Sequence, residues 1–282
     1  MTHHPGFPPA PPALEAIFRR RKVIIGMIHL PPLPGSPAHA GASMAQITAH
    51  ALAEAGMLRA AGMDGLIVEN HGDIPFLRPA DLGPETAACM AVIAAAVRAQ
   101  TGLPIGINVL ANGGRMAIAV AKAAGAAFVR INQFANAYVA NEGLLDGEAG
   151  LVARDRRRLD AGEVRIFADV HVKHGAHAIT GDRPIGELAR DVEFFGADVA
   201  IATGQRTGDA AADDEIAAIA AGCRLPVITG SGATADNIAR ILHRCQGAIV
   251  ASWLKRDGTW WNPIDPERLR AFMQAANAAR AA

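Results

Sequence analysis

Short apolar segments alternate with longer alanine-rich amphipathic segments along the whole chain, and this alternation constrains the fold more than any other feature. Parallel strands need crossover connections of about a dozen residues, usually helices. The apolar segments predict eight strands, at Val23–His29, Gly65–Glu69, Pro104–Val109, Ala126–Ile131, Val164–Val170, Asp198–Ala202, Pro226–Thr229 and Gly247–Ala251. The amphipathic segments predict helices at Ser43–Ala61, Pro84–Gln100, Gly114–Ala124, Gly147–Leu159, Ile185–Phe195, Asp213–Gly222, Ala235–His243 and Pro266–Ala279. Eight such units predict a single-domain (β/α)8 barrel.

The barrel domain is expected over residues 22–282, after a Pro-rich N-terminal tail over residues 1–21. An open doubly wound sheet is the alternative, but its nucleotide-binding G-x-G-x-x-G fingerprint is missing after the first strand, where the chain reads Gly26-Met-Ile-His-Leu-Pro. In a barrel, the chemistry belongs to the carboxyl ends of the strands and to the loops that follow them.

Composition excludes several classes of protein. The chain has 282 residues, is 51% hydrophobic and 19% charged, and has a formal net charge of +0, which argues against a dedicated nucleic-acid binder. A membrane span is not expected, because Lys, Arg, Glu or Asp interrupts each long apolar stretch. Cys89, Cys223 and Cys245 lack metal-site or redox spacing, so we expect packing roles in a reducing compartment, and hence a cytoplasmic protein.

Polar and ionisable side chains gather at the predicted carboxyl ends of the strands. They are His29, Glu69, Asn70, Asn108, Arg130, Asn132, Asp169, His171 and Gly204 with Thr203. Strand alternation places Asp169 and His171 on one face, predicted to be the barrel interior. A buried carboxylate is costly without a partner or a task, so Asp169 is the group expected to be most needed for turnover.

The expected roles divide these residues in two. Asp169, Glu69, His171 and His29 are the candidate acids and bases, and Asn70, Asn108, Arg130, Asn132, Lys173 and Gly204 are the candidate substrate ligands. Alternatively, Asp169 only pairs with Arg130 or Lys173. No cofactor is required by the pattern; Mg²⁺ held by Glu69 and Asp169, zinc held by histidines 171, 174 and 177, and an imine on Lys173 are open alternatives.

Turns of small polar residues follow the last two predicted strands. Gly230-Ser231-Gly232 follows the seventh predicted strand and leads toward a helix that Thr234 and Asp236 are expected to open, and Ser252 follows the eighth strand. Turns at these two positions hold phosphate groups in many (β/α)8 barrels. We therefore expect Gly230, Ser231, Gly232 and Ser252 to bind phosphate.

Two further loops have unusual composition. Leu30-Pro-Pro-Leu-Pro-Gly-Ser-Pro37 must be extended and stiff, and is expected either to form a wall or lid over the mouth of the barrel or to offer a strand to a partner. The loop containing Trp260 and Trp261 either caps the site or forms a contact between subunits of a homo-oligomer, and we favour the oligomer contact.

At these same residues the chain resembles the BtpA/SgcQ family. The similar motifs are Gly26–Pro37, Val68-Glu-Asn-His-Gly-Asp-Ile-Pro-Phe76, Gly106-Ile-Asn-Val-Leu110, Ala168-Asp-Val-His-Val-Lys-His174, Gly230-Ser-Gly232 with Asn237, and Ser252-Trp-Leu-Lys-Arg-Asp-Gly258 with Asn262-Pro263. The resemblance implies a (β/α)8 barrel, with a role in photosystem I biogenesis in cyanobacterial relatives and a link to sugar metabolism in others. The chain departs from the family pattern at Ala111-Asn112-Gly113 and at Asn141-Glu142-Gly143.

Two functions are consistent with these features. The first is an enzyme acting on a small phosphorylated sugar or ribosyl-type substrate, as an isomerase, a lyase or a glycosidic-bond-cleaving enzyme. The second is a non-catalytic assembly or stability factor of the photosystem I biogenesis type. We favour the enzyme, because a scaffold gives no reason to gather carboxylates, amides and imidazoles at one rim.

Overall fold

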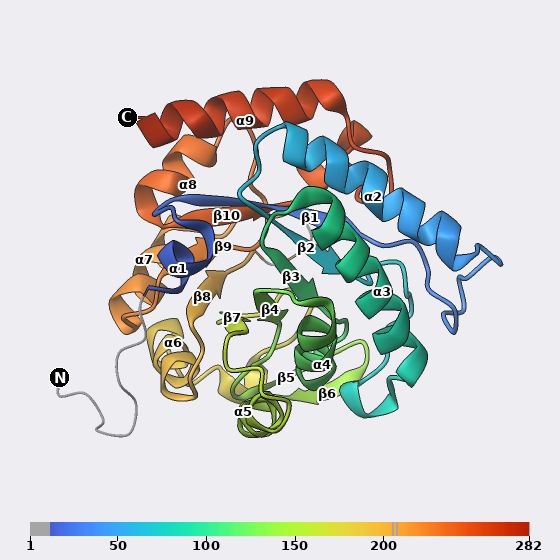
Figure 1. Cartoon of the computed structure of the whole chain (residues 1–282). Helices are drawn as coiled ribbons and strands as arrows, with labels where there is room; N and C mark the ends of the chain where they lie inside the picture. Colours follow the sequence, from blue (N-terminus) through green and yellow to red (C-terminus); the bar gives the residue numbers. More distant parts are fainter. Residues whose placement is uncertain (1–11, 205, 207, 282) are drawn as a thin grey trace.

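A computed structural model describes residues 12–204, 206 and 208–281 of the chain. Eight parallel strands close into a barrel in the order β1-β10-β9-β8-β7-β4-β3-β2 (Figure 1). They are β1 (Val23–His29), β2 (Gly65–Glu69), β3 (Ile105–Asn108), β4 (Phe128–Ile131), β7 (Arg165–Asp169), β8 (Val199–Ala202), β9 (Val227–Thr229) and β10 (Gly247–Val250). The predicted (β/α)8 barrel is confirmed.

Helices surround the barrel and bury an apolar layer against the outer faces of the strands. They are α2 (Met44–Ala60), α3 (Pro84–Thr101), α4 (Gly114–Ala124), α5 (Ala149–Arg158), α6 (Ile185–Phe194), α7 (Asp213–Gly222), α8 (Ile238–Arg244) and α9 (Pro266–Ala281). In the described part of the chain, no helix is long and apolar enough to cross a membrane. Helix α8 begins three residues later than predicted, because Thr234 and Asn237 close a turn by exchanging hydrogen bonds between side chain and backbone.

A second apolar cluster fills the interior of the barrel. Phe128 of β4 and Phe167 of β7 stack at 4.4 Å, with Ile25, Ile201 and Ile249 in the same cluster. These side chains are buried because alternate residues of each strand point to the barrel axis. The interior is therefore packed with side chains below the mouth.

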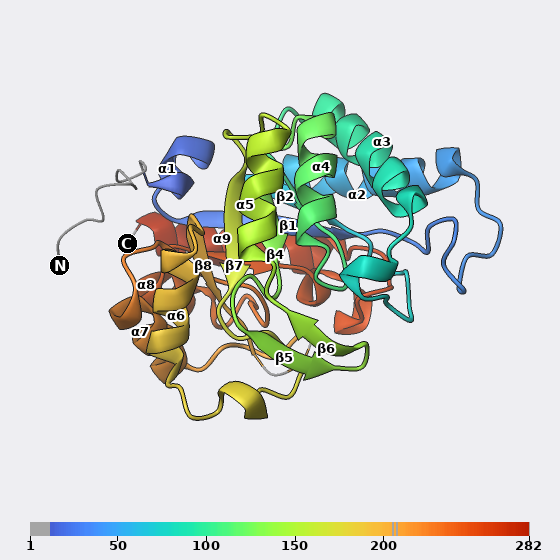
Figure 2. The same ribbon diagram turned by 90° about the horizontal axis from the view of Figure 1, so that it is seen from below.

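Helix α1 (Ala13–Phe18) closes the amino-terminal end of the barrel (Figure 2). Phe18 packs edge-on against Phe128 and Phe167, with ring centroids 5.7 and 6.5 Å apart. Within the tail expected over residues 1–21, residues 1–11 lie outside the described part, and residues 13–18 form this helix. The hairpin of β5 (Ala137–Ala140) and β6 (Gly143–Asp146), which the sequence did not predict, stands at the opposite end.

Candidate functional site

The register of the barrel places a row of polar side chains at one height. His29 pairs with Glu69 across β1 and β2, Glu69 pairs with Asn108 across β2 and β3, and Asn108 pairs with Arg130 across β3 and β4. Partners in adjacent parallel strands point to the same face, so these four groups form a polar layer above the apolar interior. The expected gathering of polar groups at one rim follows from this register.

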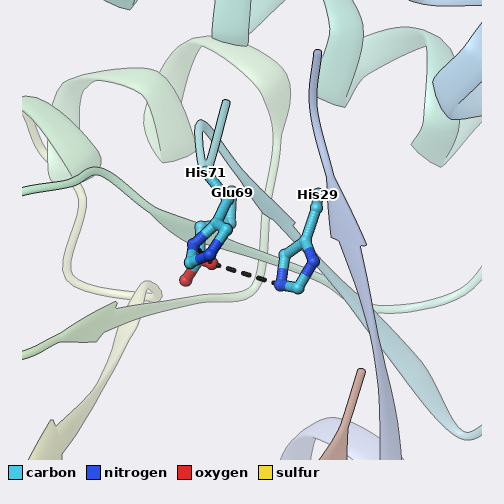
Figure 3. Close-up of side chains that lie close together, drawn as sticks. All are labelled: His29, Glu69 and His71. Carbon is cyan, nitrogen blue, oxygen red and sulfur yellow. Dashed lines mark ion pairs between the residues drawn. The ribbon is translucent and has the colours of Figure 1, made fainter. Parts of the chain in front are cut away.

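His29, Glu69 and His71 form a compact cluster at the ends of β1 and β2, shown in Figure 3. Nε2 of His29 lies 3.4 Å, and Nδ1 of His71 3.0 Å, from Oε1 of Glu69. The side chains of His29 and Glu69 are each 6% exposed, and that of His71 is 13% exposed. Trp260 covers the two imidazoles edge-on, with ring centroids 5.8 Å from His29 and 4.3 Å from His71. Trp260 therefore caps the site, which is the alternative that we did not favour for this loop.

Burial and neighbouring charges set the protonation of this cluster. Burial lowers the pKa of His29 to about 3, although the charge of Glu69 opposes this, so the imidazole is neutral at pH 7. Burial alone would raise the pKa of Glu69, but the close polar contact with His71 and the positive charge of Arg130 outweigh it and lower that pKa to about 2. An ionised carboxylate therefore faces a neutral imidazole.

Asp169 and Arg130 form a buried ion pair beside this cluster. Nε of Arg130 donates to Oδ1 of Asp169 at 3.0 Å, and Nη2 donates to Oδ2 at 2.9 Å. Nδ2 of Asn132 donates a third hydrogen bond to Asp169, at 3.1 Å. Burial opposes the charge on the guanidinium, but Asp169 outweighs it and raises the pKa of Arg130. Asp169 therefore pairs with Arg130, which is one of the alternatives that the sequence left open.

Lys173 lies on the loop after β7 and faces the same space as the cluster. Burial and the charge of Arg130 lower the pKa of Lys173, and Glu69 and Asp169 oppose the shift. Within the described residues, its ammonium group makes no hydrogen bond or ion pair. The amine of Lys173 is thus available to a ligand.

The turn after β9 presents backbone amides. The amide of Gly230 donates to the carbonyl of Ala202 at 2.8 Å, whereas those of Ser231, Gly232 and Ala233 donate to no other residue that the structure describes. Gly232 has φ +69°, and a Cβ there would lie 2.1 Å from the amide nitrogen of Ala210. The glycine is therefore needed for contact with the neighbouring loop as well as for the turn itself.

Two cavities adjoin at the mouth of the barrel and share Glu69, His71, Arg130 and Lys173. The turn cavity, of about 130 Å³, is lined by these four residues together with His29, Gly230, Ser231, Gly232, Ala233 and Ser252. The aromatic cavity, of about 460 Å³, is lined by the same four together with Phe76, Asn132, Tyr138 and Trp260. The arrangement suits a ligand with one polar and one flat apolar part.

Five predicted site residues do not line either cavity: Asn70, Asn108, Asp169, His171 and Gly204. Asn70 joins two loops, because its side chain exchanges hydrogen bonds with the backbone of Leu110. Asn108 donates to Asn132, and the ring of His171 lies tilted against that of His177, with centroids 3.8 Å apart. Asn70, Asn108, Asp169 and His171 therefore contact the groups around the site without lining it.

The proline-rich loop after β1 forms no wall of either cavity. Leu33, which is buried, donates its amide to Oδ1 of Asp73 at 2.7 Å. Gly72 packs so tightly against Pro31 and Pro32 that a Cβ would lie 2.6–2.7 Å from their backbone atoms. The loop therefore packs against the loop after β2. It does not form the expected wall or lid over the mouth.

Sequence reasoning missed His71, Tyr138 and Phe76 as parts of the site. His71 follows Glu69 by two residues, and the same alternation that led to Asp169 and His171 would have placed it beside Glu69. Tyr138 lies on the unpredicted hairpin and Phe76 on a long loop, where no periodic signal gives a direction.

The fold and the rim define a (β/α)8 barrel protein with a polar site at the carboxyl ends of its strands. The chain belongs to the BtpA family, whose model matches residues 20–278. It is 40% identical over 255 residues to an uncharacterized protein of Archaeoglobus fulgidus, with 90% of this chain and 98% of that protein covered. It is 38% identical over 266 residues to the photosystem I biogenesis protein BtpA of Synechocystis, with 92% of this chain and 89% of that protein covered.

Solved structures share the fold at low sequence identity. The structure of (S)-3-O-geranylgeranylglyceryl phosphate synthase from Thermoplasma acidophilum, in complex with its substrate sn-glycerol-1-phosphate, is similar with a TM-score of 0.60. The two chains are 15% identical, and the match covers 94% of this chain and 97% of the synthase. At this identity the likeness concerns the fold.

Proposed function

We propose that this protein is an enzyme that acts on a small phosphorylated substrate, of the sugar or ribosyl type. The amides of Ser231, Gly232 and Ala233 bind the phosphate, and Ser252 lies in the same cavity. The observation that carries the proposal is that these three residues line the turn cavity and that their amides donate to no other described residue. Amides held by a glycine turn are ready donors for an anion.

Two further observations support the phosphate site. The turn follows the seventh strand of the barrel, and Ser252 follows the eighth, which is where (β/α)8 enzymes commonly hold phosphate. The synthase from Thermoplasma acidophilum, with a similar fold, has a phosphorylated substrate. Lys173 lines the same cavity, where its amine can donate to a phosphate oxygen.

The remainder of the substrate extends past Glu69 and Lys173 into the aromatic cavity. Both places where the sequence departs from the family pattern contribute to that cavity, through Ala111, Asn112, Asn141 and Glu142. The phosphate turn, in contrast, keeps the pattern. We therefore assign the specificity of this protein to the end of the substrate that carries no phosphate. Isomerisation, lyase cleavage and glycosidic cleavage all suit such a site.

Binding of phosphorylated probes tests the proposal. Thermal unfolding is measured with inorganic phosphate, ribose 5-phosphate and a nucleoside monophosphate, and the two phosphate esters are compared with ribose and with the nucleoside. A ligand at 100 times its dissociation constant stabilises the folded state by about 2.7 kcal/mol. We expect stabilisation by the phosphorylated probes alone.

Two alanine variants distinguish a specific effect at the turn from the general effect of adding a side chain at a glycine with positive φ. Gly232→Ala places a Cβ against Ala210, and we expect phosphate binding to be lost. Gly102→Ala is the matched control, because Gly102 has φ +66° with nothing within 4 Å of an added Cβ. Equal affinity of the two variants for phosphate would exclude the turn. If no phosphorylated probe stabilises the wild-type protein, a non-catalytic assembly role, as the name of the Synechocystis relative indicates for that protein, becomes the better explanation.

A further inference from the structure

The His29–Glu69–His71 cluster gathers three metal-ligand types around one point. One nitrogen of each histidine and one oxygen of Glu69 lie within 4.8 Å of one another. Figure 3 shows the imidazole of His29 directed at the carboxylate of Glu69, with His71 beside it. We propose that these three side chains bind a divalent transition-metal ion, with Zn²⁺ as the best-fitting ion. The site differs from the ion sites considered from sequence, which used Glu69 with Asp169 or histidines 171, 174 and 177.

The distances suit ligands around a common centre. Zinc lies about 2.0–2.1 Å from imidazole nitrogen and carboxylate oxygen, so two ligand atoms of a tetrahedral site are roughly 3.3 Å apart. Oε1 of Glu69 lies 3.4 Å from Nε2 of His29 and 3.0 Å from Nδ1 of His71. Nδ1 of His71 is buried and lacks a hydrogen bond of acceptable geometry to any described residue, in spite of its closeness to Glu69. Two imidazole nitrogens lie beside one carboxylate oxygen, and neither makes a hydrogen bond to a residue that the structure describes. An ion between the three atoms accounts for this arrangement.

Asp169 does not compete for the role of ligand. Three hydrogen bonds from Arg130 and Asn132 occupy its carboxylate. The same ion pair balances the charge of Arg130, so that Glu69 is left to offset a bound cation. Two imidazoles and one carboxylate form the donor set of several catalytic zinc and iron sites.

The ion would be shielded on one side and accessible on the other. Trp260 packs against the edges of both imidazoles. All three ligands also line the turn cavity, and Glu69 and His71 line the aromatic cavity. A site with three protein ligands keeps a position open, and here that position faces the space proposed for substrate. An oxygen of a carbonyl or hydroxyl group is the class of substrate atom that such an ion polarises.

Cobalt and zinc binding test the assignment without any substrate. Protein without an affinity tag is stripped with a chelator and titrated with Co²⁺, whose visible absorption reports coordination by four or five ligands. Zinc content is measured after dialysis against Zn²⁺. We expect one equivalent of either ion. Removing a ligand should weaken binding by more than the 10–100-fold typical of losing a group that only orients a ligand.

The variants are His71→Ala and Glu69→Gln, with His243→Ala as the control for an exposed histidine. Circular dichroism establishes that each is folded, and Glu69→Gln, which keeps the shape of the side chain, decides the question if His71→Ala does not fold. Loss of the cobalt spectrum in either folded variant, with retention in His243→Ala, supports the site. Absence of stoichiometric binding to the wild-type protein overturns it. So does binding that survives in Glu69→Gln but disappears in His171→Ala, which would move the ion to the loop after β7. Because phosphate binding is measured separately, either proposal can fail alone.

Discussion

The Arg130–Asp169 pair allows a quantitative test of how the rim is held together. Asp169 accepts three hydrogen bonds, two from Arg130 and one from Asn132, and the side chains of the pair are 2% and 0% exposed. Asp169→Asn keeps the shape of the side chain but leaves the guanidinium without a counter-charge. Its amide NH₂ would also face a hydrogen-bond donor, from Arg130 or from Asn132. Breaking a buried pair in this way costs about 3–5 kcal/mol.

The assay is thermal and urea unfolding, followed by circular dichroism and tryptophan fluorescence. For a protein near this size, each kcal/mol lowers the melting temperature by about 2–4 °C, so we expect a fall of roughly 6–20 °C. Asp81→Asn is the control, because Asp81 pairs with Arg78 at the surface, where a pair is worth about 0–1 kcal/mol. The double variant Arg130→Met/Asp169→Leu should recover most of the loss, since no buried charge remains. A loss for Asp169→Asn no larger than that for Asp81→Asn would refute this reasoning.

Three further changes test other parts of the molecule, each by its effect on the free energy of unfolding. Phe18→Ala should cost about 3–5 kcal/mol, because the ring fills the amino-terminal end of the barrel. Phe194→Ala should cost far less, because Phe194 is 74% exposed. Equal losses would contradict the packing role of Phe18. Ser43→Ala should cost about 1 kcal/mol by removing the capping box of α2, and an unchanged stability would mean that the cap is unimportant. Lys255→Met should cost about 3–5 kcal/mol, because buried Glu54 would lose its buried counter-charge and keep only the half-exposed His50, whose Nε2 lies 3.7 Å from Oε1 of Glu54. A smaller loss than that of Ser43→Ala would count against a buried ion pair.

Much of the fold could be predicted because the repeat is encoded locally. All eight barrel strands lie where the apolar segments placed them, and their register follows from closing the barrel. The hairpin at Ala137–Ala140 and Gly143–Asp146 escaped prediction because each strand has only 4 residues, which is too few to show a clear apolar alternation. Helix α1 escaped because the prolines before it suggested an extended segment.

The site could be predicted only in part. Strand ends placed Glu69, His29 and Arg130 at the rim correctly, because a strand fixes the direction of its side chains. The strand pattern could not indicate that Arg130 would occupy both oxygens of Asp169, since that depends on side-chain geometry between β4 and β7. Trp260 was assigned more readily to a subunit contact for the same reason, because a loop residue has no direction until the loop is folded. The expected homo-oligomer stays a prediction that light scattering can test.

The pairing of Lys255 with Glu54 also bears on the order in which the molecule is completed. The two residues are 201 positions apart in the chain, and both are buried. Their contact joins α2, in the first βα unit, to the loop after the last strand, so it can form only when β10 has closed against β1. That loop begins with Ser252 and includes Trp260. A nascent chain, or one shortened at its C-terminus before this loop, would therefore lack two of the groups that line the mouth.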